Sequence, residues 1–169
     1  MLLFWRFGET FNWLFFKYLI FFSALLIVFV IDLQHGIIPD VISLPLILLG
    51  IGSTFVPGND VTFLSALTSG ATGFGLFLLV GYAFEKLTGK EGMGGGDIKL
   101  IAAVGTFMGF AGLLFTVLFS SFSAVILMML IRHQREKIFP YGPFIVVAAF
   151  VYEVFGNIII ARYLGLFGL

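Results

Sequence analysis

Cysteine is absent from the 169-residue chain, which excludes disulfide bonds, cysteine-based zinc sites and thiol nucleophiles. Histidine is almost absent: His35 and His133 are too few to build a histidine metal site, so we predict no bound metal. Charged residues make up only 11% of the chain, and the nine acidic and nine basic side chains cancel. This balance does not favour binding to nucleic acid.

Apolar residues dominate instead, at 60% of the chain, whereas an ordinary soluble domain contains roughly 45–50%. Several apolar runs approach the ~20 residues that cross the hydrocarbon core of a bilayer. The first run is followed by others, so it is not a lone signal peptide. We therefore expect an all-α, polytopic membrane protein embedded in lipid, with about six transmembrane helices. The expected spans are residues 13–31, 41–55, 61–84, 98–110, 113–131 and 144–160.

Residues 1–8 are expected to be the remnant of a preceding helix or a short N-terminal segment, and residues 9–169 the transmembrane domain. Within the third span, Ser65, Ser69 and Gly73 recur every fourth position. Small residues at this spacing allow two membrane helices to pack closely.

Basic residues near the span ends indicate the orientation, because cytoplasmic loops are enriched in lysine and arginine. The loops on the side of Asp32 and Asp97 carry six basic residues, and the opposite side carries three. Both aspartates are therefore expected at the cytoplasmic face. The six are Lys86, Lys90, Lys99, Arg132, Arg135 and Lys137; the three are Arg6, Lys17 and Arg162.

Residues 92–100 (GMGGGDIKL) place four glycines before Asp97 and an apolar run after it. Glycine permits unusual dihedrals and close approach by another backbone. An ionisable side chain at a membrane boundary suggests function, although a plain N-cap role is the alternative for Asp97. Neither a P-loop nor a dinucleotide-binding fingerprint fits, because the required residues do not follow the glycines.

Asp32 and Asp97 form the candidate catalytic pair, since both lie at span boundaries on one side of the membrane. Two adjacent carboxylates do not both ionise easily, so they share a proton. The ionised group can then activate water while the protonated group polarises a peptide carbonyl. No serine-hydrolase elbow or zinc-protease helix occurs in the chain.

Three motifs resemble those of the bacterial type IV prepilin peptidases, aspartic peptidases of the Gly-x-Gly-Asp type. Residues 32–40 (DLQHGIIPD), in which an Asp precedes a Pro-Asp pair, are similar to the family's first motif, and residues 92–100 resemble its Gly-x-Gly-Asp signature. The third is residues 136–144 (EKIFPYGPF), where Tyr141 stands in place of the usual Phe. Their order along the chain makes this resemblance more specific than a single glycine-rich segment would be.

The resemblance implies that Asp32 and Asp97 are catalytic and need no cofactor for proteolysis. It implies a multi-pass protein of the bacterial inner membrane that removes basic leader peptides from type IV prepilins or type II secretion pseudopilins at the cytoplasmic face. Most bacterial members carry an N-terminal Cys-rich zinc domain that is lacking here. The family's second activity, N-methylation with S-adenosylmethionine, is therefore left open.

The sequence also predicts roles for several other residues. Gly94, Gly95 and Gly96 are expected to let an extended substrate come close, and Lys99 to bind substrate or tune Asp97, or to anchor at the headgroups. Asp40 is predicted to cap the second span, and Glu153 to face the bundle interior. The competing function is a proton- or cation-coupled transporter.

Overall fold

A computed structural model describes residues 13–89, 92–130 and 140–166, with side chains to residue 156. The predicted N-terminal remnant, residues 1–8, lies outside this range. The described helices are α2 (Trp13–His35), α3 (Asp40–Gly52), α4 (Phe63–Thr88), α5 (Gly95–Leu130) and α6 (Gly142–Leu166), with a short 3-10 turn η1 (Ser53–Phe55). The described part of the chain is thus all-helical, as expected.

Three of these helices, α2, α4 and α5, are long and apolar enough to cross a membrane, and shorter apolar helices cover Asp40–Phe55 and Gly142–Gly156. Large apolar side chains remain exposed on the outer faces of the bundle, where lipid would cover them. This arrangement confirms a polytopic membrane protein.

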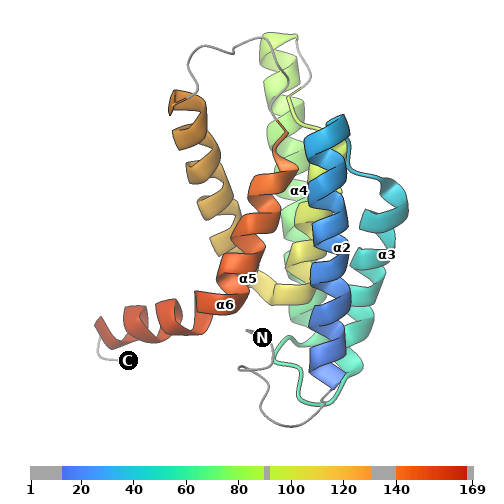
Figure 1. Cartoon of the computed structure of the whole chain (residues 1–169), viewed down its shortest axis with the longest axis vertical. Helices are drawn as coiled ribbons and strands as arrows, with labels where there is room; N and C mark the ends of the chain where they lie inside the picture. Colours follow the sequence, from blue (N-terminus) through green and yellow to red (C-terminus); the bar gives the residue numbers. More distant parts are fainter. Residues whose placement is uncertain (1–12, 90–91, 131–139, 167–169) are drawn as a thin grey trace.

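Helix α5 consists of two helical arms separated by a backbone break at Gly109, where φ is 69° and ψ is −169°. We name residues 95–108 the first arm and residues 110–130 the second arm. The chain reverses at the break, because Gly73 of α4 lies against both Ile101 and Leu113, which a straight helix would separate by about 18 Å. Figure 1 shows the second arm returning alongside the bundle. Counting the arms separately gives six helices within the described residues, in agreement with the separate spans predicted before and after residues 109–112.

The first arm occupies the centre of the bundle, which explains why its sequence is apolar on every face. Its buried residues run almost without interruption from Ile98 to Met108. Phe107 stacks on Phe21 of α2 with the ring centroids 4.2 Å apart. Residues surrounding this arm complete the core: Leu25, Val28, Leu46, Phe77, Ile145 and Ala149.

The small residues of α4 pack against the first arm, as their spacing predicts. Ser69 Oγ donates to the backbone carbonyl of Gly105 at 2.7 Å. A Cβ built on Gly105 would lie 2.8 Å from the backbone oxygen of Ser69. Close backbone contact of this kind requires glycine at position 105.

A buried lysine lies at the end of the bundle where α5 breaks. Lys17 is only 6% exposed, and its ammonium donates to Phe107 O at 3.1 Å and to Asn59 Oδ1 at 2.9 Å. Breaking a helix deprives the carbonyls of its last turn of their partners, so Lys17 replaces one of the missing donors. Glu153 is 4% exposed and interacts electrostatically with Lys17, which confirms that Glu153 faces the interior.

Candidate active site

Asp32 is held in the last turn of α2 by the way that helix ends. Gly36 follows the helix with φ of 67°, a left-handed conformation that glycine adopts without strain. Its N–H donates to the carbonyl of Asp32 at 2.8 Å. The helix therefore stops one turn beyond Asp32, and the carboxylate lies at the opposite end of the bundle from Lys17.

Asp97 lies in the first turn of the first arm of α5, after an exposed glycine segment. The helix begins at Gly95, and the N–H of Asp97 donates to Gly94 O at 3.1 Å. Asp97 is therefore inside the helix, and the alternative that it is merely an N-cap is wrong. Gly94 and Gly95 are exposed, whereas Gly96 and Asp97 are half-buried.

The fold brings Asp32 and Asp97 together from helices far apart in the sequence. Their carboxylates interact electrostatically. Ile38, in the loop between α2 and α3, lies against glycines from two other elements: a Cβ on Gly96 would be 2.6 Å from Ile38 Cβ, and one on Gly142 would be 3.0 Å from Ile38 Cδ1. The loop after Asp32, the start of α5 and the start of α6 therefore meet around Ile38.

The start of α6, which falls within the third motif, provides a further element of the site, although the sequence assigned Gly142 no role. The backbone N–H of Gly142 approaches the carboxylate of Asp32, and a Cβ on Gly142 would lie 2.5 Å from Asp32 Oδ2. Helix N-termini favour anions through their exposed N–H groups and dipole. Asp32 Oδ2 is nevertheless buried without a hydrogen-bond partner among the described residues.

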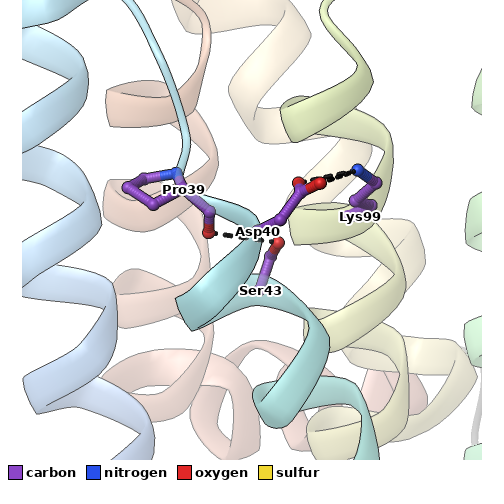
Figure 2. Close-up of polar contacts among 4 residues, drawn as sticks. All are labelled: Pro39, Asp40, Ser43 and Lys99. Atoms are coloured by element: carbon purple, nitrogen blue, oxygen red, sulfur yellow. Dashed lines mark hydrogen bonds and ion pairs between the residues drawn. The ribbon is translucent and has the colours of Figure 1, made fainter.

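Lys99 and Asp40 form an ion pair beside the two carboxylates. Lys99 Nζ lies 2.6 Å from Oδ1 and 2.7 Å from Oδ2 of Asp40. Figure 2 shows the pair joining the first turn of α3 to α5. Pro39 precedes the first residue of α3, and no side chain caps that helix. The prediction that Asp40 caps the second span is therefore wrong: its carboxylate binds Lys99 instead, and the N–H groups of the first turn of α3 use Pro39 O.

A metal-ligand cluster is not part of this site. Within the residues that the structure describes, no three His, Cys, Asp or Glu side chains are grouped so that they could hold a metal ion. The chemistry available at the site is that of two carboxylates, nearby backbone amides and an accessible glycine segment.

Fold and site together define a polytopic helical membrane protein with a paired-carboxylate centre at one end of its bundle. The type IV leader peptidase family matches residues 19–129, and the chain belongs to this family. The match covers both aspartates, and it removes support for the transporter alternative.

Relatives carrying the name prepilin leader peptidase/N-methyltransferase are similar over nearly the whole chain. The Xanthomonas campestris pv. campestris protein is 36% identical over 98% of this chain and 58% of its own length. Those of Stutzerimonas stutzeri and Pseudomonas aeruginosa are 36% and 34% identical, each over 95% of this chain and 56% of their own lengths. The chain thus spans a little over half the length of these relatives. No solved structure matches it.

Proposed function

We propose that this chain is an aspartic endopeptidase in which Asp32 and Asp97 are the catalytic residues. The observation that carries the proposal is the position of both carboxylates at one end of the bundle, close enough for their charges to interact, in a member of a leader peptidase family. One carboxylate, ionised, would take a proton from the attacking water. The other, protonated, would donate to the carbonyl oxygen of the scissile peptide.

The substrate would approach Asp97 along Gly94, Gly95 and Gly96. Cleavage requires an extended peptide, whose backbone can pair with another exposed backbone segment. The exposure of Gly94 and Gly95 supports this route. Lys99, whose side chain is 27% exposed in its pair with Asp40, would contact the substrate from the adjacent helical turn.

The substrates would be type IV prepilins or type II secretion pseudopilins, and the product a basic leader peptide. The relatives' name and the motifs support this part of the proposal, in which the enzyme would lie in the bacterial inner membrane with its site at the cytoplasmic face. The apolar body of the prepilin would remain in lipid while its leader enters the site.

Methyl transfer is not part of the proposal. S-adenosylmethionine is charged and carries a polar nucleoside, so its site needs polar or acidic side chains. A cleft between α4 and the second arm of α5 has an apolar lining: Thr72, Gly73, Leu76, Phe110, Leu113, Leu114 and Val117. The lining of this cleft does not fit such a cofactor.

The decisive experiment incubates the detergent-solubilised full chain with a prepilin that carries a basic leader. We expect Asp32→Asn and Asp97→Asn each to abolish cleavage, because each removes one half of the acid–base pair. Asp60→Asn, an exposed carboxylate at the other end of the bundle, serves as the control and should cleave normally. Substantial cleavage by either active-site variant, with unchanged folding, would refute the assignment.

A further inference from the structure

Tyr141 lies immediately before α6 and connects that helix to the second arm of α5. Its backbone carbonyl accepts from the N–H groups of Phe144 at 3.0 Å and Ile145 at 3.4 Å, so it marks the first turn of α6. Its hydroxyl lies 2.7 Å from Ser120 Oγ and 3.1 Å from Ser121 Oγ. The next residue, Gly142, directs its N–H toward Asp32.

The hydroxyl contacts matter because of their surroundings. Ser120 is fully buried, and the Tyr141 ring packs against the apolar core. Polar groups in such an environment depend on partners within the protein. Phenylalanine at position 141 would fill the same space but leave Ser120 with only its bond to the carbonyl of Val117.

Gly142 is tightly packed against its neighbours. A Cβ there would meet Asp32 Oδ2 and Ile38 Cδ1 at 2.5 and 3.0 Å, so the backbone of Gly142 lies almost in contact with the carboxylate. A small shift of the first turn of α6 would therefore change the contact between the Gly142 N–H and Asp32.

We propose that Tyr141 is a positioning residue for the peptidase reaction. Its hydrogen bonds to Ser120 and Ser121 hold the first turn of α6 so that the Gly142 N–H remains directed at Asp32. The second arm of α5, which provides neither aspartate, thereby acts on the site. This inference rests on the proposed peptidase function and concerns a hydroxyl that phenylalanine, the residue usual in the resembled motif, lacks.

The test compares cleavage kinetics of a labelled prepilin by Tyr141→Phe, by Ser120→Ala/Ser121→Ala and by the triple variant. We expect Tyr141→Phe to lower kcat about three- to tenfold with KM within twofold, since the proposal gives Tyr141 no contact with the substrate. The serine double variant also removes the bond from Ser120 to the carbonyl of Val117, so it should lose at least as much activity. The triple variant should lose no more than the serine double variant, because the bonds between Tyr141 and the two serines are already absent from it. Tyr82→Phe, an exposed tyrosine on α4, is the matched control and should retain parental kcat.

Amide hydrogen exchange in the peptide that begins α6 gives a readout independent of cleavage. We expect exchange there to accelerate at least threefold in Tyr141→Phe and to stay unchanged in Tyr82→Phe. Parental kcat in Tyr141→Phe, losses that multiply in the triple variant, or unaltered exchange would each overturn the inference. A parent enzyme that cleaves no prepilin would instead contradict the proposed function, and hydrogen exchange would still decide whether Tyr141 holds the turn.

Discussion

At the residue scale, Gly142 shows how closely the backbone approaches a carboxylate in this site. We expect Gly142→Ala to lower kcat about 100-fold, because displacement of a reacting group by ~1 Å has effects of that size. The new methyl group would lie 2.5 Å from Asp32 Oδ2 and push the carboxylate aside. Gly75→Ala, whose Cβ would enter open space on α4, should retain parental kcat in the same prepilin assay. An active Gly142→Ala enzyme would mean that the position of Asp32 is not critical.

Gly95 and Gly96 are neighbours, but only Gly96 is packed tightly against another part of the chain. Alanine substitutions at the two positions can therefore distinguish a structural role from a substrate-binding role. A Cβ on Gly96 would lie 2.6 Å from Ile38 Cβ and 3.1 Å from its carbonyl oxygen, whereas Gly95 has nothing within 4 Å. Overpacking typically costs about 1–3 kcal/mol, so Gly96→Ala should lower the melting temperature by roughly 2–12 °C. Gly95→Ala should melt at the parental temperature or slightly above it.

The same two variants then report on the substrate. If an extended peptide approaches Gly95, the added methyl group in Gly95→Ala should raise KM for prepilin several-fold despite unchanged stability. Equal KM values would remove Gly95 from the substrate path, and a stable Gly96→Ala protein would contradict the close packing around Ile38.

At the element scale, the Lys99–Asp40 ion pair ties α3 to the first arm of α5. The pair is partly exposed, at 27% and 56% for the two side chains, and such pairs contribute about 0.2–1 kcal/mol. We expect Lys99→Met and Asp40→Asn each to lower the melting temperature by roughly 0.4–4 °C. The exchanged variant, Lys99→Asp with Asp40→Lys, should recover most of that loss.

Prepilin kinetics of the exchanged variant distinguish two roles of Lys99. If the ion pair serves only to join the helices, kcat/KM should recover together with the melting temperature. If Lys99 also contacts the substrate, as proposed, kcat/KM should stay low in the exchanged variant while stability returns. If both kcat/KM and the melting temperature recover, Lys99 does not bind the substrate.

At the scale of the whole molecule, the sequence predicts the membrane spans and predicts that the two aspartates lie at the same end of the bundle. Apolar runs and turn residues determine both, because each depends on local chemistry and chain direction. Contacts between residues far apart in the sequence cannot be predicted from apolar runs and turn residues. The ion pair of Asp40 with Lys99 and the bonds from Lys17 to the broken arm of α5 depend on which helix faces pack together. The approach of Gly142 to Asp32 likewise arises only in three dimensions.

The orientation of the bundle in the membrane can be tested with single cysteines, since the chain contains none of its own. Gln34 and Pro57 are exposed at opposite ends of the bundle, and Gly75 lies in the middle of α4. Basic residues are enriched in the loops at the end of the bundle that carries Asp32, which predicts that this end lies on the cytoplasmic side. A membrane-impermeant maleimide should therefore label Gln34→Cys only in inverted vesicles. Pro57→Cys should react only from the opposite side, and Gly75→Cys, at hydrocarbon depth, from neither. The reverse pattern would place the carboxylate pair outside the cytoplasm, where a leader that stays on the cytoplasmic side could not reach it.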